Sequence, residues 1–341
     1  MTLSAPSVVV AGMRVLLAAM LALFAIGCDC SGGEASGGGE EGGRRTVAVI
    51  PKGTTHVFWR SVHAGALRAG NELDVEILWQ GPQREDDRAA QVRVVEDMVS
   101  RGVDAIVLAP LDSTALVPVA TEATGEGIPV VIFDSGIEWD GLVSFVATDN
   151  YQGGVLAAER MNTLLGGEGR VMVMRYQEGS DSTSRREAGF LETMRERFSA
   201  IEIVSDNQYG GATTETAYQT AENLLVRFPE VDGVFTPNES TTFGMLRALQ
   251  EGNRTGDVKL VGFDANEGLV AALRAGQVHG LVLQNPERMG ELAVRTAIAH
   301  LDGETVEARI DTGATMVTRE NMQEPAVAAL LSPDLSILEG E

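Results

Sequence analysis

Lysine and cysteine are both scarce in this chain of 341 residues. Lys52 and Lys259 are the only lysines, so arginine supplies the rest of the positive charge, and the formal net charge is −23. No basic patch stands out, which argues against nucleic acid as a partner. The simplest interpretation of the diffuse negative charge is solubility. An apolar content of 44 % over this length allows two domains with sizeable cores.

Cysteine and histidine indicate neither disulfides nor a metal in the folded part. Cys28 and Cys30 are the only cysteines, and both lie near the N-terminus, which excludes a disulfide framework further along the chain. The four histidines have no metal-ligand spacing, and we interpret them as structural or surface residues in that respect. They are His56, His63, His279 and His300.

The motifs of common enzymes are missing as well. The chain has no Walker-type phosphate loop, no G-x-S-x-G elbow and no strand-linked G-x-G-x-x-G. We therefore expect a protein that does no covalent chemistry and needs no cofactor.

The N-terminus has the pattern of an export signal. Arg14 is followed by an apolar run that is too short for a comfortable membrane-spanning helix, and small residues follow it. We predict a signal peptide over residues 1–27, with Met1 or Met13 as the start. Residues 25–28, Ala-Ile-Gly-Cys, resemble the lipobox of bacterial lipoproteins, which implies lipidation of the Cys28 thiol. The alternative is an ordinary cleaved signal with incidental cysteines.

A tether is expected to follow this signal. Residues 31–43 are rich in Gly, Ser and Glu and contain no large apolar residue, which is typical of a flexible linker. We expect a disordered, lipidated tether over residues 28–45, with order beginning near Thr46. Asp29 resembles an inner-membrane retention signal of enteric lipoproteins, a rule that varies between bacteria.

Strand and helix patterns alternate beyond Thr46, which favours parallel sheets with helices on both faces. Strands are predicted over residues 46–50, 75–79, 105–109, 128–134, 143–147, 170–174, 201–204, 234–236, 258–264, 278–284, 305–310 and 315–318. Helices are predicted over residues 58–73, 89–101, 113–125, 151–165, 185–198, 213–228, 241–250, 265–275 and 286–301. The segment beyond residue 320 has no clear pattern.

Two strands end alike. Residues 128–134 and 258–264 are β-branched apolar runs that end in Phe-Asp, as buried strands of a parallel sheet do. Ligands of such sheets bind outside the carboxyl ends of the strands, so we expect Asp134 and Asp264 to face one cleft from two similar lobes. We interpret the two runs as parts of two lobes of one ancestry. Chance similarity is the alternative, because any two doubly wound domains share such strands.

Four motifs carry a family resemblance: residues 128–134, Ala-Thr-Asp-Asn-Tyr-Gln-Gly-Gly at 147–154, Arg-Glu-Ala-Gly-Phe at 186–190 and Val-Gly-Phe-Asp at 261–264. Together they resemble the ribose-type periplasmic binding proteins of ABC sugar importers, whose fold also serves lactose-repressor-like regulators. The resemblance implies an α/β fold of two doubly wound lobes joined by a three-crossing hinge that closes on a ligand.

The resemblance also implies domain boundaries. Lobe 1 would comprise residues 46–148 and 285–310, and lobe 2 residues 149–284 and 311–325. A C-terminal tail would span residues 326–341.

The same resemblance implies ligand contacts. Phe58 and Trp59 match the aromatic pair after the first strand, and Asp134 matches the lobe 1 carboxylate. Arg186 matches the arginine before the Gly-Phe pair, and Asn238 the asparagine after residues 234–235. Flat aromatic rings suit the C–H faces of a sugar, and these polar groups suit its hydroxyls.

Phe263 and Asp264 match the family's aromatic–acid pair, and Gln284 the glutamine at a crossing. His56 and Ser135 stand where ribose binders have asparagine and arginine, which argues against ribose itself. The ten predicted ligand-binding residues are His56, Phe58, Trp59, Asp134, Ser135, Arg186, Asn238, Phe263, Asp264 and Gln284.

Structural roles compete for the polar members of this set. Asp264 and Glu267 have the spacing of a capping box, and Asn238 follows a proline where it could cap the next helix. Asp134 precedes Ser-Gly and is compatible with a turn. Arg186 has the pattern of a solvated helix charge beside a glutamate.

The other members have plain alternatives too. Phe58, Trp59 and Phe263 suit a core, and Gln284 before Asn-Pro suits a turn. The acidic run of residues 85–87 does not end a strand, and we interpret it as a solvated loop or the start of a helix.

The predicted function is a lipid-anchored receptor in the periplasm or cell envelope. It would capture a small neutral sugar or polyol as a monomer and deliver it to an ABC permease and its ATPase. One alternative is a sensor for a membrane kinase or chemoreceptor. Another is an enzyme with Asp134 and Asp264 as an acid–base pair. A repressor is disfavoured because leader and tether stand where a DNA-binding domain would. The particular sugar and the anchoring membrane stay open.

Overall fold

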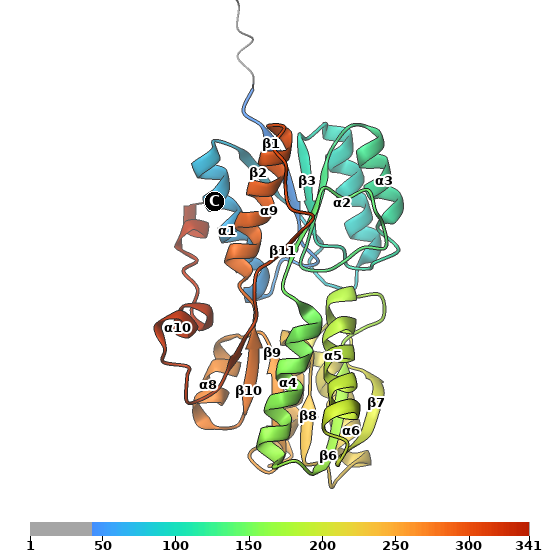
Figure 1. The fold of residues 1–341 in the computed structure, drawn as a ribbon, viewed down its shortest axis with the longest axis vertical. Coiled ribbons are helices and arrows are strands. Elements are labelled where there is room, and N and C mark those ends of the chain that lie inside the picture. Colours follow the sequence, from blue (N-terminus) through green and yellow to red (C-terminus); the bar gives the residue numbers. More distant parts are fainter. Residues whose placement is uncertain (1–42, 341) are drawn as a thin grey trace, which may run out of the picture. The chain divides into compact units, whose positions relative to one another are not determined.

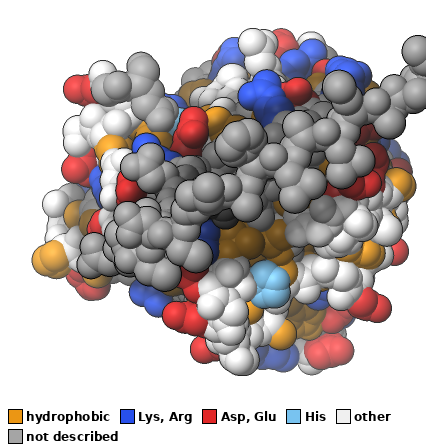
Figure 2. Space-filling view, turned by 90° about the horizontal axis from the view of Figure 1, so that it is seen from above, with side chains coloured by type: hydrophobic (Ala, Val, Ile, Leu, Met, Phe, Trp, Pro, Cys, Tyr) orange, Lys and Arg blue, Asp and Glu red, His pale blue; other side chains and the backbone are white. Residues whose placement is uncertain are grey.

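The computed structural model describes residues 43–340. The predicted signal peptide, Cys28 and most of the predicted tether lie outside the described residues. Within residues 43–340, no helix combines the length and the apolar character that a membrane span requires. Acidic and basic side chains are scattered over the face shown in Figure 2, in keeping with the diffuse charge of the sequence.

Lobe 1 is a parallel sheet between two layers of helices (Figure 1). Its strands run in the spatial order β11-β5-β4-β3-β1-β2. They are β1 (Thr46–Ile50), β2 (Glu76–Trp79), β3 (Ala105–Leu108), β4 (Val130–Phe133), β5 (Ser144–Ala147) and β11 (Arg309–Asp311). One face packs against α1 (Val57–Leu73) and α9 (Pro286–Leu301), the other against α2 (Arg88–Arg101) and α3 (Val117–Gly125). β3 and β4 are buried throughout, as continuous apolar runs predict.

Lobe 2 repeats this plan with the strand order β12-β10-β9-β8-β6-β7. The strands are β6 (Gly169–Arg175), β7 (Ile201–Tyr209), β8 (Gly233–Phe235), β9 (Lys259–Phe263), β10 (Gly280–Leu283) and β12 (Thr315–Val317). Helices α4 (Asn150–Leu165) and α5 (Asp181–Arg197) cover one face. Helices α6 (Thr214–Arg227), α7 (Glu239–Glu251) and α8 (Glu267–Ala275) cover the other. The predicted fold class of two doubly wound lobes is confirmed.

The two Asp-ended runs occupy the same place in their sheets. β4 lies between β3 and β5 in lobe 1, and β9 lies between β8 and β10 in lobe 2. Their neighbours therefore correspond one to one, which supports the interpretation of two lobes built on one plan.

Within residues 43–340, three segments cross between the lobes. They are the link from β5 to α4 at Thr148, the link from β10 to α9 at Gln284, and residues 312–314 between β11 and β12. Two of the crossings lie side by side, since the Thr148 hydroxyl donates to the Gly313 carbonyl at 3.1 Å.

The last strand departs from the sequence expectation. β12 runs antiparallel to β10, although the strand patterns predicted parallel sheets. The chain leaves lobe 2 along β10 toward lobe 1 and returns along β12, so the two strands have opposite directions. β5 and β11 both run toward lobe 2, so these two strands are parallel.

One helix starts later than predicted. The pattern placed its start at residue 113, but α3 begins at Val117. The Asp112 carboxylate accepts the backbone N–H groups of Thr114 and Ala115, and this turn occupies the segment expected to be the first helical residues.

The C-terminal segment, without a predicted structure, returns to lobe 1. Helix α10 (Pro325–Leu331) buries Val327 in the lobe 2 core. The 3₁₀-helix η1 (Ser336–Gly340) then contacts α1. Arg68 of α1 donates to the Asp334 carbonyl oxygen at 2.8 Å. The segment is thus held by both lobes, as Figure 1 shows at its red end.

Candidate functional site

The two strand-end aspartates have nearly identical backbone geometry. Asp134 follows β4 with φ 60°, and Asp264 follows β9 with φ 61°. This left-handed region is uncommon for residues other than glycine, although Asp and Asn tolerate it. The Asp134 amide donates to the Val146 carbonyl of β5, and the Asp264 amide to the Val282 carbonyl of β10. The chain thus makes the same bend at the carboxyl end of each sheet.

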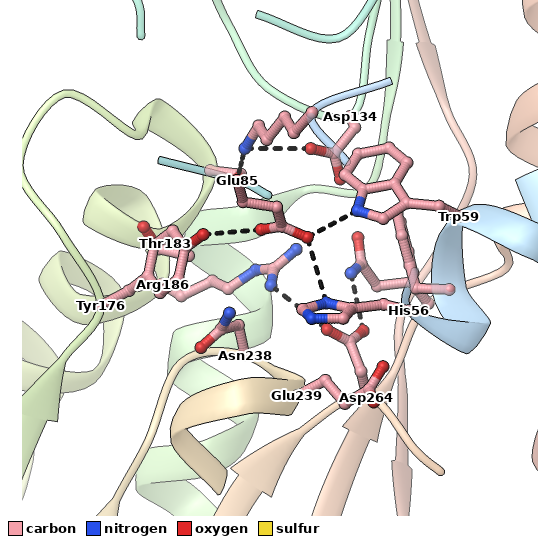
Figure 3. A pocket seen from close by; sticks show the side chains of 14 residues that line it. His56, Trp59, Glu85, Asp134, Tyr176, Thr183, Arg186, Asn238, Glu239 and Asp264 are labelled. Carbon is pink, nitrogen blue, oxygen red and sulfur yellow. Dashed lines mark hydrogen bonds and ion pairs between the residues drawn. The ribbon is translucent and has the colours of Figure 1, made fainter. Parts of the chain in front are cut away.

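Both aspartates line one cavity between the lobes (Figure 3). Its volume is about 30 Å³. The described residues that line it are Lys52, His56, Phe58, Trp59, Glu85, Asp134, Tyr176, Ser182, Thr183, Arg186, Asn238, Glu239, Asp264 and Gln284. The geometry agrees with the expectation that Asp134 and Asp264 face one cleft.

On the lobe 1 side, Asp134 pairs with a buried lysine. The Lys52 ammonium lies 3.1 Å from Asp134 Oδ2, and the lysine is only 3 % exposed. The same ammonium donates to the hydroxyls of Ser180 and Ser182 in lobe 2, at 3.3 and 3.0 Å. The ion pair neutralises a buried charge within lobe 1, and the bonds from Lys52 to the two serines join the lobes.

On the lobe 2 side, Asp264 lies between Arg186 and Gln284. Gln284 donates from Nε2 to Asp264 Oδ1 at 2.8 Å, and Arg186 Nη1 lies 3.8 Å from Oδ2. Burial raises the pKa of Asp264, while Arg186 and Gln284 act in the opposite direction. The guanidinium is fixed further by bonds to Asn150 Oδ1 and the Pro237 carbonyl.

A second acidic centre, which the sequence did not predict, is Glu85. Its carboxylate accepts the indole N–H of Trp59 and the phenol of Tyr176, both at 2.6 Å, and lies 3.1 Å from His56 Nδ1. Burial alone would raise the pKa of Glu85, but the hydrogen bond and charge of His56, with Tyr176 and Trp59, lower it to about 2. Burial lowers the pKa of His56, but the hydrogen bond and charge of Glu85, together with the charges of Glu239 and Asp264, outweigh it and raise this pKa to about 9.

Two buried oxygens of the cavity find no hydrogen-bond partner among residues 43–340. They are Gln284 Oε1 and Glu239 Oε2. The other carboxylate oxygen of Glu239 accepts from Asn266, and burial raises the pKa of this glutamate. Buried acceptors without a partner are costly, so these oxygens suit a ligand that brings hydroxyl donors.

Eight of the ten predicted residues line the cavity, and two do not. Ser135 is fully buried behind it, where its hydroxyl accepts the Ser182 amide. Phe263 is also fully buried, with the Arg186 guanidinium carbon 4.1 Å from its ring centroid. Whether the ten residues contact a ligand stays a prediction.

Several structural alternatives are now decided. Asn238 does cap α7, since its side chain accepts the Thr241 amide. The capping box at Asp264 is wrong, because Asn266 is the N-cap of α8. A solvated Arg186 is wrong too, since this side chain is only 2 % exposed. The interpretation of residues 85–87 as solvated fails for Glu85, which is 8 % exposed.

Six lining residues escaped prediction: Lys52, Glu85, Tyr176, Ser182, Thr183 and Glu239. The rule that ligands bind at strand ends offered a signal for two of them. Tyr176 follows β6 directly, and Lys52 lies two residues beyond β1. Among residues 43–340, no group of acidic, histidine or cysteine side chains has the arrangement of a metal site.

Comparison with known proteins places this architecture in a family. Residues 47–305 match the model described as periplasmic binding protein domain. The chain belongs to this family. The ribose import binding protein of Bacillus subtilis is 26 % identical to it over 81 % of this chain and 88 % of its own length. The D-ribose/D-allose-binding protein of Pseudomonas aeruginosa is 30 % identical over 78 % and 85 %.

Solved structures agree with the family. A carbohydrate transporter solute-binding protein of Agrobacterium radiobacter, in complex with D-arabinose, is similar with a TM-score of 0.82 and 34 % identity. The match covers 85 % of this chain and 99 % of that one. An ABC transporter solute-binding protein of Agrobacterium vitis with bound D-fucose is similar with a TM-score of 0.81 and 36 % identity. The match covers 84 % of this chain and 99 % of that one. Both are named as solute-binding proteins of transporters.

Proposed function

We propose that this protein captures a small neutral sugar or polyol between its lobes and delivers it to an ABC importer. The main observation is one cavity between the lobes to which both contribute aromatic rings and carboxylates, with amides from lobe 2 and a crossing. The relatives support the class of ligand, since their names specify D-ribose, D-allose, D-arabinose and D-fucose.

The aromatic pair suits one face of a sugar ring. Phe58 and Trp59 lie edge to face, with ring centroids 4.8 Å apart and an interplanar angle of 88°. Such a pair offers one flat surface and one edge, so a pyranose can stack its C–H face on one ring only. Rigid aromatic surfaces give contact area at little loss of entropy.

The polar groups suit the hydroxyls. Carboxylates accept, Arg186 donates, and Gln284 keeps a free acceptor. A hydrogen bond with a charged partner contributes roughly 1.5–3 kcal/mol. A sugar that lacks the matching hydroxyl would leave a buried group unpaired, which gives the site its selectivity.

Closure of the lobes is part of the proposed function. Several hydrogen bonds join the lobes beside the cavity, among them the Gly136 amide to Asp181 at 3.1 Å and Arg88 to the Glu178 carbonyl at 2.7 Å. The three crossings supply a hinge. A ligand that contacts both lobes favours the closed state by its additional contacts there.

The location in the cell envelope is also a proposal. The predicted signal peptide and lipobox support an anchor formed by a lipid on Cys28. Expression of the full chain in a bacterial host with labelled palmitate tests this anchor. We expect label in the membrane fraction and none for Cys28→Ser, and label retained by that variant would contradict the anchor.

Isothermal titration calorimetry with pentoses, hexoses and inositols tests the capture of a sugar. We expect one sugar per chain, with the sugar recovered unchanged. No binding across the panel would contradict the proposal. Recovery of an altered sugar would favour the enzyme alternative instead.

A further inference from the structure

Glu85 differs from the two acids beside it. Asp86 and Asp87 are exposed, and Asp87 caps α2 by accepting the Ala90 amide. Glu85 turns inward from the same loop and lines the cavity. Only one acid of this run thus reaches the site.

The surroundings of Glu85 are closely fitted to it. A Cβ atom on Gly53 would lie 2.9 Å from Glu85 Cγ, so the lack of a side chain there makes room for the glutamate. The backbone carbonyl of Glu85 accepts from Gln177 of lobe 2 at 2.9 Å. Both its side chain and its backbone are therefore held in place.

Each donor to the Glu85 carboxylate is itself a lining residue of the cavity. Trp59 and His56 come from lobe 1, and Tyr176 comes from lobe 2 (Figure 3). Because the bond from Tyr176 crosses the cleft, opening the hinge breaks it. The bonds from Trp59 and His56 stay within lobe 1 and do not depend on closure.

We propose, on the basis of the proposed sugar-binding function, that Glu85 is a positioning residue for ligand capture. It fixes the orientation of Trp59 and His56 toward the sugar. Through Tyr176, it links that orientation to closure of the lobes. Glu85 thus makes affinity depend on closure without supplying the main ligand contacts itself.

Electrostatics support the same role. The carboxylate is buried and charged, and removing one partner of a buried ion pair leaves the other uncompensated. His56 faces Glu239 and Asp264 of lobe 2 in addition to Glu85. Burial and the negative charge of Glu85 raise the pKa of Tyr176, so its phenol stays a donor to Glu85. Without the Glu85 charge, His56 therefore loses its strongest support for the protonated form.

The test compares Glu85→Gln, Tyr176→Phe and the double variant with Asp86→Asn as the matched control. Each purified full chain is titrated with D-ribose, D-arabinose, D-fucose and D-allose, and dissociation rates are measured by stopped flow. We expect Glu85→Gln to raise Kd at least about tenfold, and Asp86→Asn to change it less than about twofold. Tyr176→Phe should raise the dissociation rate. The double variant should raise Kd by less than the product of the two single fold-changes, because the two residues share one hydrogen bond.

The pH profile separates positioning from a structural role. In the wild type, Kd should rise as the pH passes about 9, where His56 deprotonates. In Glu85→Gln the dependence should move to lower pH, because His56 has lost its partner. Asp86→Asn should keep the wild-type profile.

Failure has two distinguishable forms. If the wild type binds neither these four sugars nor any other member of the panel of pentoses, hexoses and inositols, the proposed function is wrong. If the wild type binds and Glu85→Gln matches Asp86→Asn in Kd, dissociation rate and pH profile, the role of Glu85 is overturned. Should Glu85→Gln not fold by circular dichroism, an unchanged dissociation rate in Tyr176→Phe overturns the link to closure.

Discussion

The two lobes share a backbone plan in detail. Their strand orders correspond, and each places an aspartate in the left-handed region at the end of the equivalent strand. Each also brings two helices into close contact through glycines. In lobe 1 these are Gly65 of α1 and Gly290 of α9, and in lobe 2 Gly154 of α4 and Gly189 of α5.

The side chains around the equivalent aspartates differ. Asp134 has a lysine whose other partners lie in the opposite lobe, whereas Asp264 has an arginine and a glutamine from its own lobe or the crossing. Lobe 1 contributes the aromatic wall, and lobe 2 contributes more of the polar groups. The backbone thus places an aspartate at the cavity in both lobes, while only the partner of Asp134 reaches across to the other lobe.

Substitution of the glycines at the helix contacts should have the largest effect on the free energy of unfolding. A Cβ on Gly154 would lie 2.0 Å from the Arg186 carbonyl oxygen, and one on Gly290 would lie 2.1 Å from the Val62 carbonyl oxygen. Backbone must shift in both lobes, so we expect Gly154→Ala and Gly290→Ala each to lower the free energy of unfolding by about 3 kcal/mol. Urea denaturation measures this.

The control for this pair is Gly125→Ala. Gly125 lies in α3, and no described atom comes within 4 Å of a Cβ placed there. Alanine should stabilise the helix by about 0.5–1 kcal/mol. If only one of the two lobes is destabilised, the equivalence of the helix pairs fails.

One buried glutamate in each lobe should make the free energy of unfolding depend on pH, with opposite signs in the two lobes. Burial raises the pKa of Glu187 in lobe 2 to about 7, while that of Glu85 in lobe 1 is lowered to about 2. A raised pKa in a carboxyl group means that the folded state binds the proton more tightly, so stability falls as pH rises from about 4.5 to about 7.

Glu187→Gln should remove that loss. Relative to the wild type, the variant should gain up to about 3 kcal/mol between pH 4.5 and pH 7.5, by denaturation at each pH. A constant difference across this range would show that Glu187 does not titrate there.

Asp134 and Asp264, at equivalent positions of the two lobes, should both contribute to sugar affinity. Asparagine tolerates the same backbone conformation, so Asp134→Asn and Asp264→Asn change charge with little change of shape. Each should weaken sugar binding by about 1.5–3 kcal/mol, roughly 10- to 150-fold in Kd, by calorimetry. Asp134→Asn should also destabilise the fold more, because Lys52 lies closer to Asp134, at 3.1 Å, than Arg186 does to Asp264, at 3.8 Å. Arg186 also keeps its bonds to Asn150 and the Pro237 carbonyl. Equal free energies of unfolding in the two variants would contradict the different structural roles of Asp134 and Asp264.

The attachment of the C-terminal segment should matter least. Arg68→Ala removes the donor to the Asp334 carbonyl and the ion pair with Glu287. These contacts are partly exposed, so we expect a loss of about 1 kcal/mol in the free energy of unfolding. Arg60→Ala, at an exposed position of the same helix, is the control. A loss above that of the glycine variants would indicate that this segment governs the packing of both lobes.

Much of the fold and part of the site could be predicted from local pattern. Uninterrupted apolar runs mark buried parallel strands, and residues that follow them lie at the ligand edge, which located Asp134 and Asp264. Glu85 gave no such signal, because its burial depends on Gly53 in another loop and on Tyr176, 91 positions away. Lys52 did have this signal, since it lies two residues beyond β1, but its serine partners in the other lobe depend on the tertiary structure.

The sequence by itself determined the succession of strands and helices, because apolar spacing and the ends of apolar runs act over a few residues. Only the tertiary structure decided the direction of β12, the return of the C-terminal segment to lobe 1, and the inward turn of Glu85. Each of these depends on which distant segments meet when the lobes pack. Local sequence patterns do not predict such long-range contacts, since burial and charge pairing depend on residues that are distant in the sequence.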